Sequence, residues 1–439
     1  MCACVCVYVC ECADTLFIHF FVMCAQAALA ECTRIGALAG AAPAADFTLL
    51  LSLIDEHGGP ARAPLALRTA VCDTIATLCE RHDDNRVTAG AACVSALVVL
   101  LQSSTDNATV CAAALHAARW LAGGATFATR CESNISTMLS GDGLAVLLAV
   151  MRAHVADSRV CEWGCEALFA LARPAKAKAV IVSASGLAVI LAAMAAHVGV
   201  SGIQQQGCAA LNGLAANADN QVAIVAAGGL PAILAAMAAH VGVSGVQQRG
   251  CWALANLAAN ADNQVAIVSA GGLPVILAAM AAHAGVSGVQ KYGCLLLGNL
   301  AGIAANQTTI VSAGGLPIIL AAMAAHVGVS GVQQSGCSAL MNLAGNAANQ
   351  VTIVLEGGLS AIVTAMSTHV GVSGVQHYGC HALFNLSLAP SNLPRMKADR
   401  GVAAALQAAQ AAHPGHAVIQ KYARLCMNAL TDDSRCVIV

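Results

Sequence analysis

Apolar residues recur along this chain at helical spacing, and short breaks rich in Gly, Ser or Asn separate the apolar runs. Residues 219–260 show the pattern clearly. A short helix is predicted to end at Ala227, because Gly228-Gly229 supplies a sharp break. A second helix has Pro231 in its first turn, and a third begins at Ser244. Apolar positions of this third helix follow the i, i+3, i+4 spacing of a buried face: Val246, Gly250, Leu254, Leu257 and Ala258.

The three-helix pattern returns every 43 residues. Gly-Gly-Leu-Pro begins at Gly228, Gly271 and Gly314, and looser copies begin at Asp142, Ser185, Gly357 and Arg400. Such a period indicates a helical solenoid whose units stack, with irregular units at the ends. We predict an all-α solenoid of about nine three-helix repeats. Its segments are a Cys-rich apolar N-terminal segment (1–44), degenerate repeats (45–140, in units 45–90 and 91–140), regular repeats (141–430) and a tail (431–439).

Three recurrent motifs are assigned structural roles. Ser244 and Gln247 fit a capping box at the start of the third helix, with copies in the other repeats. Histidines close the second helices, where an imidazole can bond the last carbonyls. A cysteine column suits close packing better than redox chemistry. The members of the last two columns are His154, His197, His240, His283, His326 and His369, and Cys165, Cys208, Cys251, Cys294, Cys337 and Cys380.

The short helix, the Gly-Gly break, the Pro-led second helix and the third helix reading GCWALANLA at 250–258 together resemble the armadillo repeat family. The resemblance is clear over 140–430 and weaker over 45–140. It implies a right-handed superhelix whose third helices line a concave groove that binds extended peptides. The family includes importin-alpha-like nuclear-import adaptors, adhesion and signalling scaffolds and vacuole-anchored proteins, so the resemblance does not name a ligand.

Comparison among the repeats indicates where binding would occur. In the third helices, the residue two positions before the cysteine and the residue directly after it change in almost every repeat. Four positions after the second of these, the residue is Asn in five repeats. Spacings of three and four place all three columns on one helix face. An Asn side chain offers a donor and an acceptor to a peptide backbone. The predicted peptide-binding residues are Arg249, Trp252, Asn256, Tyr292, Asn299, Asn342, Tyr378, His381, Asn385 and Asn428.

An alternative is that the Asn residues bond backbone groups between neighbouring repeats and touch no ligand. In the import adaptors the matching Asn often follows a Trp by four residues, and only Trp252 with Asn256 reproduces that pair. The groove also lacks acidic residues, so recognition of a basic import signal is not expected.

The composition and the absence of known motifs argue against several classes of function. The chain has 20 Lys and Arg against 22 Asp and Glu, so no basic stripe is available to neutralise nucleic-acid phosphates. Its 21 Cys are an odd number, which favours reduced thiols in an intracellular protein. The sequence has no P-loop, dinucleotide fingerprint, zinc-protease motif or nucleophile elbow. We therefore expect a cytoplasmic, monomeric, non-enzymatic scaffold for extended or helical peptide segments, without cofactor or metal.

Two membrane-related alternatives stay open. The terminal Cys436-Val-Ile-Val fits a prenylation pattern, and a second anchor would require acylation near Cys2 or Cys4. This alternative is a lipid-anchored membrane-trafficking adaptor. A polytopic membrane protein is the other, because Val265–Val289 has no Asp, Glu, Lys or Arg. Gly271-Gly272 and His283 interrupt that stretch and argue against a continuous span.

Overall fold

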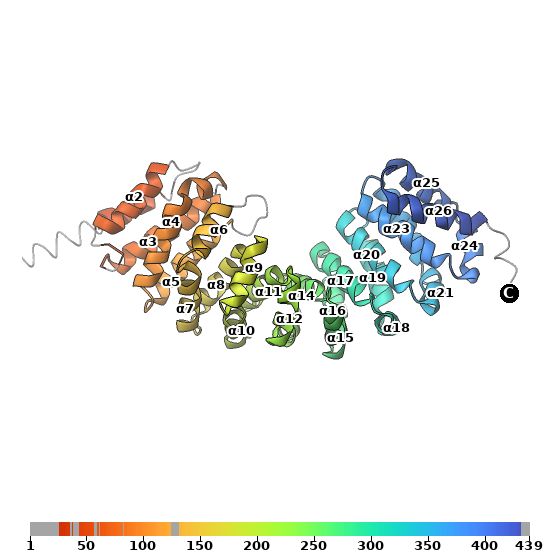
Figure 1. Ribbon diagram of the computed structural model, residues 1–439, viewed down its shortest axis with the longest axis horizontal. Coiled ribbons are helices and arrows are strands. Elements are labelled where there is room, and N and C mark those ends of the chain that lie inside the picture. The colour runs from red at the N-terminus through yellow and green to blue at the C-terminus, as the bar shows by residue number, and fades with distance from the viewer. Residues whose placement is uncertain are drawn as a thin grey trace, which may run out of the picture. The chain divides into compact units, whose positions relative to one another are not determined.

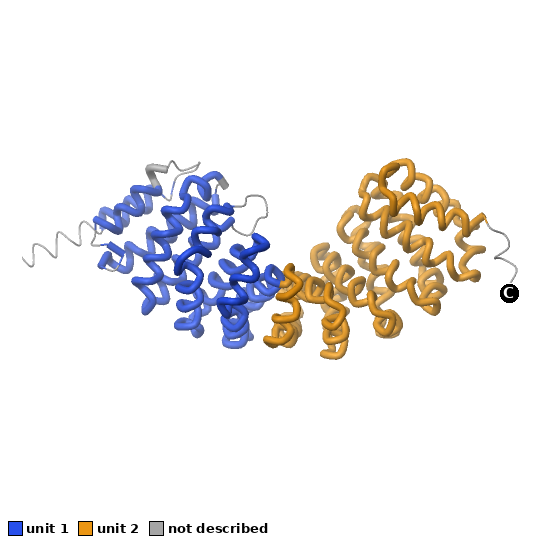
Figure 2. The backbone as a smooth tube through the Cα atoms, viewed as in Figure 1, with its two compact units in different colours: residues 1–214 blue, residues 215–439 orange. Residues whose placement is uncertain are grey.

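The computed structural model describes residues 26–35, 37, 44–56, 59, 60, 62–81, 83–123 and 131–431, and every regular element in them is helical. The chain forms two compact units, residues 1–214 and 215–439 (Figure 2). Helices follow one another in sets of three within each unit (Figure 1). The predicted all-α armadillo-like solenoid is confirmed.

The first unit begins with a helical stretch at 26–35. Its other helices are α2 (Ala44–Glu56), α3 (Leu65–Arg81), α4 (Asp83–Ser103), α5 (Ala108–Leu121), α6 (Glu132–Leu139), α7 (Gly143–Ala153), α8 (Ser158–Leu171), α9 (Ala175–Ser183), α10 (Gly186–Ala196) and α11 (Ser201–Ala215). α4 combines two helices across a kink at Gly90, whose φ of 58° lies in the left-handed region. The break at Gly90 therefore lies inside a repeat, where the sequence had predicted a boundary between repeats.

The second unit contains five sets. They are α12 (Ala218–Ala226), α13 (Gly229–Ala239) and α14 (Ser244–Leu257); α15 (Ala261–Ser269), α16 (Gly272–Ala282) and α17 (Ser287–Leu300); α18 (Ala304–Ser312), α19 (Gly315–Ala325) and α20 (Ser330–Leu343); α21 (Ala347–Leu355), α22 (Gly358–Thr368) and α23 (Ser373–Leu386); and η1 (Pro390–Asn392) with α24 (Leu393–Ala398), α25 (Arg400–Ala412) and α26 (Ala417–Thr431).

The two glycines between a first and a second helix have different structural roles: one adopts a left-handed conformation, and the other allows a close contact. Gly228 adopts a φ of 89°, which a residue with a β-carbon resists. Gly229 lies against the preceding helix, where a β-carbon would come within 2.8 Å of the carbonyl oxygen of Ile224. The first and second helices meet there at 73°. The predicted break is confirmed; in the preceding repeat Ser185 adopts the same left-handed conformation, with a φ of 67°, and only the second position keeps its Gly.

The core runs between second and third helices, and successive third helices pack on one another. Cys251 and Leu254 of α14 are fully buried. Gly250 accepts the side chain of Met237 so closely that a β-carbon would lie 2.5 Å from its Cγ. Equivalent Gly and Met pairs recur in the other regular repeats. Small residues therefore set the approach of the two helices.

The capping-box prediction is wrong. The N-cap of α14 is Val243, without a side-chain cap, and Ser244 is already helical. The Gln247 side chain is buried and donates its amide hydrogens to the carbonyl oxygens of Met237 and His240, each at 2.8 Å. These carbonyls end α13 and have no partner within that helix. Gln247 thus satisfies the end of the second helix rather than the start of the third.

The histidine prediction needs a correction of partner. Nε2 of His283 bonds the carbonyl oxygen of Val241, 42 residues earlier, at 2.7 Å. His326 and His369 bond Ala284 and Val327 in the same way. Each imidazole therefore bonds the turn that follows the second helix of the preceding repeat, not the carbonyls of its own helix.

By length and composition alone, α4 is apolar enough to cross a membrane, and six pairs of first and second helices would also qualify if each were counted as one span. The pairs are bent by 70–79°. The stretch Val265–Val289 is divided among α15, α16 and the start of α17, and α15 and α16 meet at an angle of 79°.

Candidate protein-binding face

The third helices of the second unit each leave one narrow stripe accessible. In α14, Cys251 and Leu254 are fully buried, whereas Arg249, Trp252 and Asn256 are partly exposed. These three side chains lie on one face, as their spacing predicted. We call the partly exposed positions of α14, α17, α20, α23 and α26 the third-helix face.

Aromatic and cationic groups interleave across α14 and α17. The rings of Trp252 and Tyr292 stack with their centroids 4.6 Å apart and their planes 12° from parallel. The Arg249 guanidinium lies 5.6 Å from the centroid of Trp252, and the Lys291 ammonium lies 4.9 Å from that of Tyr292. Burial raises the pKa of Tyr292. Lys291 adjoins one of the variable columns but was not predicted; its charge beside Tyr292 in the sequence was the available signal.

A second aromatic group joins α23 and α26. His381 stacks on Tyr422 with centroids 3.7 Å apart, and Phe384 contacts the same ring at 5.5 Å. Tyr378 stacks on its neighbour His377 at 4.7 Å. Burial, then the neighbouring charges of His377 and Lys421, lower the pKa of His381 to about 4, so this imidazole is neutral near pH 7. Tyr422 and Phe384 were missed because they lie one position from the predicted columns.

The Asn column bonds the protein itself. The side-chain amides of Asn299, Asn342 and Asn385 donate to the carbonyl oxygens of residues 255, 298 and 341, at 2.9, 2.8 and 3.0 Å. Each bond joins a third helix to the last turn of the preceding one. These contacts are the ones that the structural alternative requires. Since the three Asn side chains are partly exposed, their amide oxygens can still accept a hydrogen bond from a ligand.

Two further Asn residues belong to the predicted column. Asn256 is partly exposed, as the other stripe residues of α14 are. Asn428 is exposed on α26, the last helix of the described chain.

The charged side chains of the third-helix face are all positive. Arg249, Lys291, Lys421 and Arg424 lie on α14, α17 and α26, and the five helices contain no Asp or Glu. α20 and α23 contribute neutral side chains between these cations. The face therefore favours anionic groups at both ends and uncharged groups in the middle.

In the first unit, side chains of the third helices α5 and α8 contact one another. Arg119 of α5 lies between the rings of Trp120 and Trp163, 4.3 and 4.9 Å from their centroids, and pairs with the buried carboxylate of Glu166. Trp120 occupies the position that Asn holds in the second unit, and it is buried. At α5 the position that holds Asn in the second unit is therefore not accessible.

The structure describes some of the other predicted sites and not others. The repeated cysteines are buried and free, and burial raises the pKa values of Cys251, Cys294, Cys337 and Cys380 to about 12, as packing residues require. No group of three or more metal-ligating side chains occurs among the described residues. The lipidation candidates Cys2, Cys4 and Cys436 lie outside the described residues.

No protein-family model matches the sequence, and no curated protein matches it. A solved structure from work on a conserved phosphorylation switch that controls the interaction between cadherin and beta-catenin is similar to this chain, with a TM-score of 0.52 and 17% sequence identity. The similarity covers 90% of this chain and 88% of that one. At this identity the comparison establishes the armadillo-like fold alone.

Proposed function

We propose that this protein is a non-enzymatic scaffold that binds an extended segment of another protein on the third-helix face of its second unit. The proposal rests on a contrast between the buried and the accessible positions of the repeats. Repeats that agree closely in their buried positions differ at the accessible third-helix positions, where they present Trp, Tyr, Arg and Lys. These residue types dominate the energetics of protein interfaces.

The geometry favours an extended ligand. Neighbouring helices pack about 8–10 Å apart, a distance that about three residues of extended chain cover. The amide oxygens of Asn299, Asn342 and Asn385 can therefore each accept a hydrogen bond from about every third residue of such a ligand. The basic ends of the face favour a ligand with Asp, Glu or another anionic group near its ends, because complementary charge steers binding and excludes partners of like charge.

The test uses a displayed library of random peptides of about twelve residues, enough extended chain to cross four helices. We expect enriched peptides with net negative charge. The double variant Trp252→Ala/Tyr292→Ala should weaken their binding by about thirtyfold, which corresponds to about 2 kcal/mol for an aromatic hot spot. The matched control is Val222→Ala/Val265→Ala, since both valines are exposed on first helices, α12 and α15.

Enrichment of basic peptides, or equal binding by the wild type and the aromatic double variant, would refute the proposal. The lipid-anchored alternative has a separate test. Mass spectrometry of the intact protein from its native cells should detect acyl or prenyl groups on Cys2, Cys4 or Cys436 if that alternative holds, and unmodified termini would remove it.

A further inference from the structure

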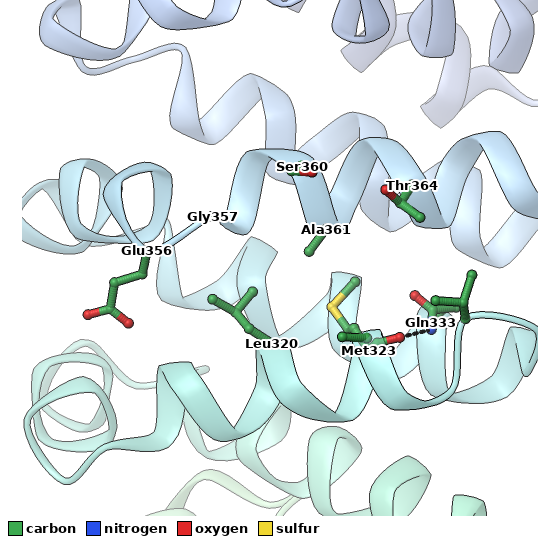
Figure 3. Close-up of a pocket in the computed structure, with 10 residues that line it drawn as sticks. Leu320, Met323, Gln333, Glu356, Gly357, Ser360, Ala361 and Thr364 are labelled. Atoms are coloured by element: carbon green, nitrogen blue, oxygen red, sulfur yellow. Dashed lines mark hydrogen bonds between the residues drawn. The ribbon is translucent and has the colours of Figure 1, made fainter.

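A hollow of about 330 Å³ lies in the second unit away from the third-helix face, between the second helices α19 and α22 (Figure 3). Leu320 and Met323 of α19 line one side, and Ala361 of α22 lies opposite them. Glu356, at the turn into α22, lies at one end, while Thr364 lies toward the other. The hollow is thus an apolar trough with a carboxylate at its mouth.

Comparison with the preceding repeats shows that the combination of Ala361 with Glu356 occurs in this repeat alone, although Ala232 matches Ala361 in the repeat that begins with α12. Position 361 is Ala, where a larger aliphatic side chain occupies the same place in the two preceding second helices. Position 356, which follows the first helix, is Glu, where those repeats have Ala. The replaced residues are Ile318 and Val275 for Ala361, and Ala313 and Ala270 for Glu356. One change opens space between the helices and the other adds a charge beside it.

Glu356 has no cation nearby in the sequence or in the described structure. It is the only Asp, Glu, Lys or Arg between Lys291 and Arg395. It is exposed, and its carboxylate makes no ion pair or hydrogen bond among the described residues. An unpaired carboxylate in an otherwise uncharged stretch contributes nothing to the packing of these repeats. Its chemistry is available to a ligand.

The other polar groups at the trough are the hydroxyls of Ser360 and Thr364, which can donate or accept, and the Gln333 side chain, which presents an acceptor. The Gln333 amide hydrogens are taken by the carbonyl oxygens of Met323 and His326, at 2.8 Å each. The far end, at Val327, is held by the Nε2 of His369, 2.7 Å from the Val327 carbonyl oxygen. The trough therefore offers apolar surface and hydrogen-bond acceptors. Such a site suits a cation on an aliphatic stem, because the stem is buried while the charge reaches the carboxylate.

We propose that this trough binds the lysine or arginine side chain of a partner protein, with its methylene groups on Leu320, Met323 and Ala361 and its charge at Glu356. The site uses other helix faces than the peptide site proposed above, and it does not depend on that site.

The test is a titration of the full chain carrying ¹³C-labelled methionine methyl groups, with hexylammonium, hexylguanidinium and neutral hexanol as probes. We expect a saturable shift of the Met323 methyl resonance with both cations and weaker binding of hexanol. The stronger cation identifies the preferred side chain. Met280 is the internal control, because it holds the same place in the preceding repeat, which has Ala at the Glu356 position.

Two variants separate the contributions. Glu356→Gln should weaken cation binding by about fivefold, the upper range for an exposed ion pair, and leave hexanol unchanged. Ala361→Ile restores the side chain of the preceding repeat and should abolish the Met323 shift. Trp252→Ala/Tyr292→Ala should change neither result.

Equal affinity for hexanol and the cations, unchanged cation binding by Glu356→Gln, or absence of any Met323 shift would overturn the proposal. Because Glu356 is exposed, its variant tests the charge even if Ala361→Ile disturbs the packing.

Discussion

The buried side-chain amide of Gln290 donates a hydrogen bond to the carbonyl oxygen of Met280, ten residues earlier, at 2.8 Å. A second bond from the same amide reaches the carbonyl oxygen of His283 at 2.9 Å. One side chain thereby closes the end of α16 and ties it to α17. The same arrangement recurs at Gln204, Gln247, Gln333 and Gln376.

Gln290→Ala should lower the free energy of unfolding by about 1–3 kcal/mol, because it leaves the Met280 carbonyl without a partner and leaves the His283 carbonyl only its bond from the Val286 amide. Ser287→Ala in the same helix should cost less than about 0.5 kcal/mol, the usual limit for a surface position without a special role. Urea denaturation followed by circular dichroism measures both. A capping box would instead give Ser287→Ala a cost of about 1 kcal/mol.

Asn299→Ala should lower the free energy of unfolding by about 0.5–1.5 kcal/mol, because the bond to the Ala255 carbonyl is lost. Asn428→Ala is the matched control, since this Asn is exposed on the last described helix and should be neutral. Thermal unfolding of the two variants tests the comparison. Equal midpoints would show that the Asn amides do not hold the repeats together.

Lys421→Glu/Arg424→Glu should weaken binding of an acidic peptide by about tenfold, because two exposed charge pairs of up to about 1 kcal/mol each become repulsive. The wild-type affinity should fall as salt rises, and the variant should lose most of that dependence. Arg152→Glu/Lys176→Glu, at exposed sites on α7 and α9, is the charge-matched control. Fluorescence anisotropy at low and high salt measures these affinities, and a salt-independent wild type would contradict the prediction.

Acidification should destabilise the contact between α23 and α26. The pKa of His381 is lowered to about 4 in the folded chain, against about 6.5 for an unperturbed histidine. Its contribution to stability is therefore complete above about pH 6.5 and is lost as the pH falls through about 4, since the unfolded chain binds the proton first. His381→Phe keeps an aromatic ring against Tyr422 and should flatten the fall in melting temperature over this range. An unchanged pH profile would assign the effect to other groups.

The sequence predicted the local structure of the regular repeats well, because that structure depends on short-range signals. Gly228-Gly229 and Pro231 mark the boundary between two helices within a few residues. The exposed face of α14 followed from spacings of three and four. The degenerate first unit was harder: Trp120 takes the Asn position, but it precedes Ala170 by 50 residues rather than 43, so the periodic comparison passed over it.

The sequence could not decide between partners that satisfy the same spacing. Ser244 and Gln247 fit a capping box by position, yet the partners of Gln247 are the carbonyls of Met237 and His240, at the end of the preceding helix. Likewise, the Asn299 amide has the chemistry to bind a peptide and also lies within reach of Ala255. Which partner is bonded depends on how the helices pack on one another, and a short stretch of sequence does not specify that packing.

The bonds between repeats have nearly constant reach along the chain: His283, His326 and His369 span 42 residues, and Asn299, Asn342 and Asn385 span 44. Each of these repeats therefore carries the side chains for its joint with the repeat before it and the backbone carbonyls for its joint with the repeat after it. Duplication or deletion of a whole 43-residue module would leave every joint matched. The array can therefore grow or shorten in genetic steps without new interface chemistry, and the length of ligand it reads would change by about three residues per module.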